Sequence, residues 1–473
     1  MFKIFQNHRR LFWLATAAGI AIRLHFGLKI IGRLDGDNAV YTALARNLVL
    51  HHVYGLMHEL VCVPTMIRMP GYPSFLAACF AIFGVDYYRP ILLIQAAVDL
   101  GTCFLIADIA RRLVGERAAR WAYIAAAVCP FIATYAGCLL SECLEIFFTS
   151  LAIDLAIVAF DAYSSGSSGR SFRYWALCGA SLAVTILLRP DGGLVLGSIG
   201  LVMVWQMFRT RQWKHHVAAG LVVTVVALSP LVPWAIRNYR IFHVVQPLVN
   251  PAALDPGEFE PFGFDAWVNT WIIDYSTTED LTFRIDSDKF DMNAIPDRAF
   301  SDDAERQQVA WLAAEYNKNY EMTPTIDAKF GAIAARHVRE HPLRVKLIYP
   351  AGRLLGMWFR PRTEMLPLDT HWWEFEDDPH DSTIAVLLAI LNAIYMFTAL
   401  AGLIKARRDL RFLGLLVVYP VVRSALLWHM STVEDRYTLE CFPMVIVLAS
   451  AYLAQLRFGR RKAEAQPTSP AVN

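Results

Sequence analysis

Apolar runs long enough to cross a lipid bilayer recur along most of the chain. A spanning helix needs about 20 predominantly apolar residues. Because lipid offers no hydrogen-bond partner to an open strand, each such run is expected to be helical. The pattern predicts an all-α polytopic membrane protein with about ten or more transmembrane helices. The runs lie at residues 11–31, 89–110, 119–137, 143–160, 175–188, 192–208, 216–236, 383–404, 412–428 and 439–456.

Positive charge recurs in every second connection between these runs. Lys and Arg precede the first run and follow the second, fourth, sixth, eighth and tenth. Cytoplasmic loops carry an excess of these residues, so these connections are assigned to the cytoplasm. The alternate connections, including residues 237–382, then face outward. We therefore predict a protein of the cell inner (plasma) membrane whose outward loops face the periplasm or the cell exterior. The first run lacks a small-residue cleavage site and is expected to remain as a span.

Two apolar segments do not fit the spanning pattern. Residues 343–359 are interrupted by Arg344, Lys346 and Arg353, and residues 71–84 are too short to cross comfortably. Both are predicted to be helices that lie in the membrane interface. The long acidic connection from about 240 to 342 predicts a small helical insertion that faces outward. The chain is thus divided into an N-terminal transmembrane catalytic region (1–236), an extracytoplasmic insertion with its interfacial helix (237–382), and C-terminal helices with a cytoplasmic tail (383–473).

Composition agrees with a membrane protein. Hydrophobic residues make up 56% of the chain and charged residues 18%, which excludes an ordinary soluble protein of this size. Most of the eight cysteines fall inside apolar runs, and no C-x-x-C spacing occurs. Neither a disulfide framework nor a zinc site is therefore indicated. No nucleic-acid partner is expected.

Acidic residues at the outward end of the first run are candidates for chemistry. Asp35 and Asp37 stand at the predicted water boundary, where a lipid-borne substrate would present its head group. An ionised carboxylate there can accept a proton from an acceptor hydroxyl. The alternative is that Asp37 caps the helix that follows it.

Arginines also gather on the predicted outward face. Arg68, Arg189, Arg237 and Arg436 all lie at outward ends of spans or in outward loops. A planar guanidinium group suits a phosphate in two-point contact. The alternative is that these side chains anchor helices at the interface.

Two further groups of polar residues are candidates for metal sites. His51, His52, His58 and Glu59 lie in the first outward loop, and the segment H-W-W-E-F-E-D-D-P-H-D begins at His371. Neither has the spacing of a known zinc motif. Solvated loops, with Trp372 and Trp373 as interface anchors, explain them as well.

The outward motifs together resemble a known family. G-D-N-A-V-Y is followed by R-M-P-G-Y-P, a loop glutamate, L-R-P, P-W-x-x-R-N and a late E-D-R-Y. From Asp35 to Pro443 this order is similar to the GT-C superfamily of membrane glycosyltransferases. The closest likeness is to family 39 protein mannosyltransferases and to lipid A aminoarabinose and galacturonic acid transferases. Many of those proteins have Asp-Glu where this chain has Asp37-Asn38, which weakens the case for a metal held by that pair.

The resemblance implies roles for particular residues. Asp37 matches the catalytic base, with Asp35 and Glu142 as acidic partners in the site. Arg68, Arg189 and Arg436 are expected to bind the donor phosphate. The residues expected to position the substrates are Tyr41, Arg237, Glu434 and Tyr437. No cofactor is firmly predicted, and a divalent metal stays open.

The activity implied is sugar transfer. The donor would be a polyprenyl-phosphate monosaccharide, and the acceptor an envelope glycan, lipid or protein on the extracytoplasmic face. One displacement at the anomeric carbon would invert its configuration. The main alternative is a transporter or flippase of polyprenyl-linked glycans, which should show an internal repeat and charges across the membrane depth. A non-catalytic assembly partner is a third interpretation.

Overall fold

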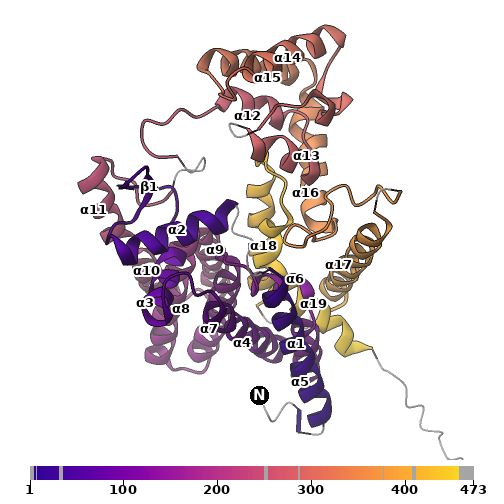
Figure 1. Cartoon of the computed structure of the whole chain (residues 1–473). Coiled ribbons are helices and arrows are strands. Elements are labelled where there is room, and N and C mark those ends of the chain that lie inside the picture. The colour runs from indigo at the N-terminus through magenta and orange to yellow at the C-terminus, as the bar shows by residue number, and fades with distance from the viewer. Residues whose placement is uncertain are drawn as a thin grey trace, which may run out of the picture.

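The structure is a computed structural model that describes residues 5–6, 8–30, 36–249, 254–285, 288–376, 378–406 and 412–456. Helices dominate it, and a lobe built from the middle of the chain stands at one end of a bundle of long helices (Figure 1). The described residues contain one pair of short antiparallel strands. The predicted all-α membrane bundle is confirmed, apart from this hairpin.

Seven helical segments among the described residues are long and apolar enough to cross a bilayer. An eighth is added if α10 (Trp213–Leu228) and α11 (Leu231–Phe242), which are bent by 40° at their junction, count as one span. The chain is thus a multi-pass membrane protein. The seven segments are built from α1 (Arg9–Ile30), α4 (Arg89–Leu113), α7 (Glu142–Ser164), α8 (Ser168–Leu188), η2 with α9 (Pro190–Gly192 and Gly193–Thr210), α17 (Pro379–Ala406), and η7 with α19 (Asp435–Cys441 and Phe442–Gln455).

Two of the predicted spans are shorter in the structure than a full crossing. Residues 119–137 form two helices, α5 (Glu116–Ala127) and α6 (Pro130–Tyr135). Proline has no N–H for the preceding helix and favours the first turn of a new one, so the break falls before Pro130. Residues 412–428 form α18 (Leu413–Leu427), which has 15 residues.

The main core lies between the long helices and contains a buried ion pair. Arg23 of α1 and Asp99 of α4 approach to 2.6 Å, and neither side chain has exposed surface. Arg23 also donates to the carbonyls of Gly19 and Ala127 and to the Cys103 sulfur. These bonds tie α1 to α4 and to the end of α5. Structural pairing therefore accounts for both intramembrane charges.

The connection between α1 and α4 contains two helices and the hairpin. Helix α2 (Gly36–Leu50) leads into strands β1 (Gly55–His58) and β2 (Val61–Pro64), which pair with Gly55 opposite Pro64 and His58 opposite Val61. The short apolar segment predicted as interfacial forms α3 (Gly71–Phe83).

The predicted insertion, between α11 and residue 343, has a hydrophobic core of its own. Trp267, Trp271 and Phe330 are among its fully buried residues. Glu305 joins two of its helices, because it accepts hydrogen bonds from Arg336 at 2.7 Å and binds His337 at 2.6 Å. The helices of this lobe are α12 (Phe262–Asn269), α13 (Tyr275–Asp280), α14 (Asp303–Tyr316) and α15 (Pro324–Glu340), with short 3-10 turns η3 (Thr282–Arg284), η4 (Met292–Ala294) and η5 (Asp297–Ala299).

The segment that joins the insertion to the C-terminal helices begins with a π-helical turn. The turn η6 (Arg344–Ile348) continues into α16 (Tyr349–Phe359), which lies between the insertion and the bundle (Figure 1). Arg353 of α16 is buried and donates to the carbonyls of Asn269 and Ile272 in the insertion. The charged side chain that interrupts the apolar run thus holds α16 against the insertion.

Candidate active site

Asp37 lies in the first turn of α2, where the helix N-terminus favours a negative charge. Gly36 begins the helix with a φ of 49°, a conformation that side chains rarely adopt. Both carboxylate oxygens of Asp37 bind guanidinium groups. Oδ1 accepts from Arg68 Nη2 at 2.7 Å, and Oδ2 accepts from Arg436 Nη1 at 3.0 Å. The structure therefore brings together three of the predicted site residues, two of them 399 positions apart.

A close approach of two helices places Arg68 beside the site. Arg68 precedes α3, and a Cβ at Gly71 would lie 2.5 Å from the carbonyl oxygen of Leu187 near the end of α8. Only glycine allows this contact without displacing the backbone. The R-M-P-G-Y-P motif thereby packs its helix onto the end of α8, directly before Arg189.

The two arginines beside Asp37 lower its pKa by more than burial raises it. Burial by itself would raise the pKa of the Asp37 carboxyl, but the guanidinium groups of Arg436 and Arg68 lower it to about 2. Asp37 is therefore ionised at neutral pH and is a weak base while both arginines hold it. A proton acceptor of this kind gains strength when an anion draws the arginines away.

The E-D-R-Y motif supplies the other side of the site. Glu434 precedes η7 and pairs with the Arg436 guanidinium through both carboxylate oxygens. The Tyr437 hydroxyl donates to Glu434 Oε1 at 2.7 Å. Arg436 Nη1 also lies 3.8 Å from Glu142 Oε1. Arg436 is thus oriented by three carboxylates, those of Asp37, Glu142 and Glu434.

Arg189 extends this network into the bundle. Its guanidinium lies 3.1 Å from Glu142 Oε1, 3.5 Å from Glu145 Oε2 and 3.3 Å from Asp191 Oδ1. The network continues through Arg423, which pairs with Asp191 and lies 3.3 Å from Glu440. Glu142 therefore links Arg189 to Arg436 across the site.

The remaining predicted residues lie in different places. Tyr41 is one turn after Asp37 in α2, and its ring packs edge-on against Tyr72 at 5.1 Å. Burial, reinforced by the negative charge of Asp37, raises the pKa of Tyr41 to about 12. Asp35 lies outside the described residues.

Arg237 is directed toward the hairpin rather than toward Asp37. It donates to the carbonyls of Tyr54 at 2.8 Å and Thr65 at 2.9 Å, and it stacks on the rings of Tyr54, Trp234 and Phe242. Arg237 thus holds α11 against the residues that flank the β1–β2 hairpin.

A cavity of about 480 Å³ opens beside Asp37 and Arg436. Several residues that line the cavity were not predicted from the sequence. They come from the insertion and from the loop after α16. There Glu364 accepts a hydrogen bond from the Tyr135 hydroxyl at 2.7 Å. A glutamate two residues after R-P-R, beyond the helix predicted to be interfacial, was the available signal. The lining residues are Gly36, Asp37, Asn38, Leu140, Tyr275, Glu279, Phe283, Glu364, Met365, Glu434 and Arg436.

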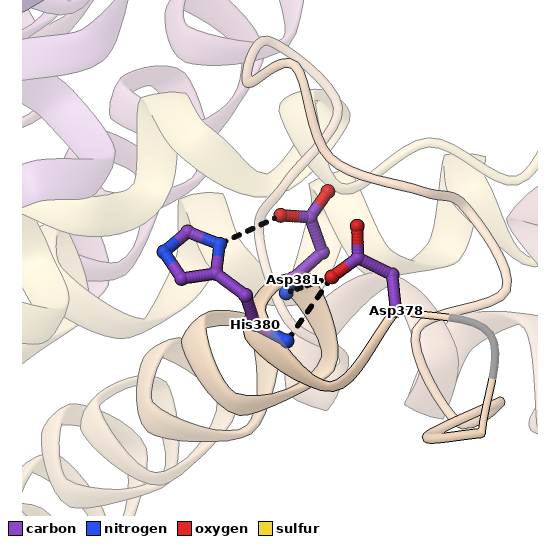
Figure 2. Close-up of side chains that lie close together, drawn as sticks. All are labelled: Asp378, His380 and Asp381. Carbon is purple, nitrogen blue, oxygen red and sulfur yellow. Dashed lines mark hydrogen bonds and ion pairs between the residues drawn. The ribbon is translucent and has the colours of Figure 1, made fainter.

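Of the two groups considered as metal sites, part of the second, the segment that begins at His371, comes together in the structure. Among the described residues, three metal-ligating side chains come together only at Asp378, His380 and Asp381 (Figure 2). Asp378 Oδ1 accepts hydrogen bonds from the backbone N–H groups of His380 and Asp381, at 3.0 and 3.1 Å. This is the geometry of a helix cap at the start of α17. The exposed His51, His52 and His58 do not join such a group.

Comparison with known proteins supports the resemblance given by the motifs. Residues 67–235 match the family described as dolichyl-phosphate-mannose-protein mannosyltransferase. This segment contains Arg68, Glu142 and Arg189, and lies between Asp37 and Arg436. No curated protein sequence matches the chain.

Two solved structures of an archaeal oligosaccharyltransferase share the fold. The archaeal oligosaccharyltransferase AglB from Archaeoglobus fulgidus, bound to an inhibitory peptide and a dolichol-phosphate, has a TM-score of 0.51 at 13% identity, over 94% of this chain and 50% of that chain. The Archaeoglobus fulgidus oligosaccharyltransferase tethered to an acceptor peptide has a TM-score of 0.52 at 15% identity, over 95% and 49%. ArnT from Cupriavidus metallidurans, bound to undecaprenyl phosphate, has a TM-score of 0.38 at 15% identity, over 93% and 77%.

The likenesses to the two archaeal structures concern the fold. The chain spans about half the length of the two archaeal structures. The predicted GT-C resemblance is confirmed.

Proposed function

We propose that this chain, a multi-pass membrane protein with the GT-C glycosyltransferase fold, transfers a monosaccharide from a polyprenyl-phosphate-sugar donor to an acceptor on the extracytoplasmic face. The acceptor is an envelope glycan, lipid or protein. The proposal depends on one observation above all: the Asp37 carboxylate is held between Arg68 and Arg436 at the wall of a cavity. A base and two phosphate-binding groups in contact are what this reaction requires.

The donor phosphate has a natural place in this arrangement. Guanidinium groups bind phosphate oxygens in charge-assisted pairs. Arg68 and Arg436 each make a bond to Asp37 that a phosphate can replace, and Glu142 and Glu434 keep Arg436 in position. Arg189, on the far side of Glu142, adds positive charge to the same region. Binding of the donor would therefore neutralise the arginines and free Asp37.

The chemical step follows from these positions. The acceptor hydroxyl oxygen attacks the anomeric carbon, and its proton passes to Asp37. The bond between the anomeric carbon and the phosphate oxygen breaks, and its electron pair stays with the departing polyprenyl phosphate. Arg68 and Arg436 stabilise the charge that develops there. One displacement inverts the anomeric configuration.

The cavity lining suggests how the sugar and the acceptor are oriented. Glu279 and Glu364 face the Asp37 side from the insertion and the loop after α16. Carboxylates accept hydrogen bonds from sugar hydroxyls, and Tyr275 and Phe283 offer aromatic surface beside them. We assign these lining residues to substrate positioning. The Tyr437 hydroxyl holds Glu434, and Tyr41 lies one turn after Asp37 in α2.

A transfer assay tests the proposal against the flippase alternative. The purified protein would be reconstituted in liposomes with a radiolabelled polyprenyl-phosphate sugar and extracted envelope acceptors, with and without a metal chelator. We expect label to appear in the acceptor with inverted anomeric configuration. Movement of labelled lipid across the bilayer without label transfer would overturn the proposal in favour of transport. Retained configuration in the product would overturn the single displacement.

A further inference from the structure

A second cavity lies in the insertion, away from Asp37. It measures about 280 Å³ and opens between the end of α15 and the π-helical turn η6. None of its lining residues lines the cavity beside Asp37. The lining residues are Thr270, Arg298, Phe300, Ser301, His337, His341, Arg344, Val345 and Tyr349.

The ionisable side chains that line this cavity include basic groups and no acidic one. It contains two arginines and two histidines and no carboxylate. Arg298 is anchored by Asp274 and by the Trp271 carbonyl. Arg344, in contrast, is exposed, and none of the described carboxylates lies within ion-pair distance of it. The cavity thus has a fixed guanidinium on one side and an uncompensated one at its mouth.

The remaining polar groups of the cavity are hydrogen-bonding side chains. His337 is buried between Glu305 at 2.6 Å and the Thr270 hydroxyl at 2.7 Å, so its ring is held still. Ser301 and His341 add donors near the opening. Because His337 and the Thr270 hydroxyl already have partners, the groups left for an anion such as a phosphate are the two guanidinium groups with Ser301 and His341.

An apolar surface begins at the mouth of the cavity. Leu343, Leu347 and Ile348 are 70%, 53% and 57% exposed, and Leu355 and Phe359 continue the exposed apolar side chains along α16. Large apolar side chains in such a row mark a membrane contact in a polytopic protein. The exposed Arg344 and Lys346 stand among them and add positive charge beside the apolar side chains. The cationic cavity therefore adjoins the Leu343 end of an exposed apolar strip that runs to Phe359.

We propose that this cavity binds the phosphate of an anionic membrane lipid, whose acyl chains lie along the strip from Leu343 to Phe359. The apolar strip favours a lipid over a soluble phosphate compound, because both parts of the molecule then have a matching surface. Lipid bound here would hold the insertion against the outer leaflet, since α16 is fastened to the insertion through Arg353. The site is distinct from the one assigned to the donor.

The test measures lipid binding directly. The detergent-solubilised full chain would be titrated with a short-chain phosphatidylglycerol and with the matching phosphatidylcholine, and binding followed by native mass spectrometry. We expect phosphatidylglycerol to bind at least about five-fold more tightly, and Arg344→Ala to remove about that preference. The matched control is Arg339→Ala, which removes an exposed arginine from the last turn of α15 outside the cavity. It should leave binding unchanged.

Other outcomes would overturn the proposal. Equal loss in R339A and R344A would mean general surface charge instead of a site. Competition by millimolar inorganic phosphate, with no loss in Leu343→Gln/Leu347→Gln, would mean a soluble anion. Because the assay contains no sugar donor, it is independent of transfer, and Asp37→Asn should bind the lipid as the unaltered protein does.

Discussion

Two arginine–carboxylate groups in this chain have the same chemistry but different surroundings. Arg23 and Asp99 pair at 2.6 Å in the core, with no exposed surface on either side chain. Asp37 pairs with Arg68 and Arg436 at 2.7 and 3.0 Å, but it is 24% exposed and lines a cavity. A ligand cannot reach the Arg23–Asp99 pair, whereas it can reach Asp37 through the cavity.

The partners of the two arginines explain the difference in role. Besides Asp99, Arg23 binds two backbone carbonyls and the buried Cys103 sulfur, none of which a ligand can replace. Arg436 binds side chains that a ligand phosphate can replace, above all Asp37. A closed pair stabilises the packing of helices, whereas an open one exchanges partners.

The largest expected effect is on transfer by an Asp37→Asn variant. The amide keeps the shape of the side chain but cannot accept the acceptor's proton, so we expect a loss of about 100-fold or more in kcat. The melting temperature in detergent should fall only modestly, because the two ion pairs that Asp37 would lose are partly exposed. Full transfer by a correctly inserted D37N protein would remove Asp37 from the role of base.

The closed pair should show the opposite behaviour. Asp99→Asn leaves the Arg23 charge buried without a counter-charge, which costs about 3 kcal/mol or more of stability. Thermal unfolding in detergent measures the loss. Transfer per folded molecule should be unchanged, so an active-site assay normalised to folded protein is the control. A D99N protein with normal stability and lost activity would place Asp99 in the reaction instead.

A smaller effect is expected from the arginines that hold Asp37. Arg68→Ala and Arg436→Ala each remove one charge-assisted contact to the donor phosphate, so donor affinity should fall about ten-fold. Arg237→Ala is the matched control, because its guanidinium binds carbonyl groups of the hairpin. It should lower thermal stability and leave donor affinity unchanged. An equal loss of affinity in all three variants would argue for a general structural effect.

The smallest effect concerns pH. Burial raises the pKa of Asp37, but Arg436 and Arg68 together lower it to about 2, below the usual value of about 4. Asp37 therefore contributes stability above about pH 4, which is lost as the pH falls toward 2. Removing Arg436 takes away the largest lowering influence. The acid limb of kcat/KM for Arg436→Ala should move to higher pH than that of the unaltered protein. An unchanged limb would mean that another group controls it.

Much of the fold could be predicted because its signals are local. Apolar runs, basic loops and interrupting charges each depend on a short stretch of sequence, and the helices α4, α7 and α17 follow from them. Breaks were harder to place. Pro130 divides one predicted run, and α10 and α11 bend at their junction, because backbone hydrogen bonding outweighs hydropathy there.

The candidate site was predicted in part. Motifs pointed to Asp37, Arg68 and Arg436, since outward carboxylates and guanidinium groups are unusual enough to be noticed. Glu364 was missed because a lone glutamate in a loop has no pattern of its own. Arg237 resembled Arg436 in the sequence, yet its contacts are with the hairpin.

The sequence alone determined that the chain is a bundle of membrane helices with polar motifs on one face, because hydropathy and charge bias act residue by residue. Only the tertiary structure decided which arginine meets which carboxylate. That choice depends on how closely helices approach, as at Gly71 against Leu187, and on which pairs the packing seals from water. Arg23 and Arg436 have the same guanidinium group. Arg23 is enclosed in the core and holds helices together, whereas Arg436 lines a cavity and is a candidate binding residue.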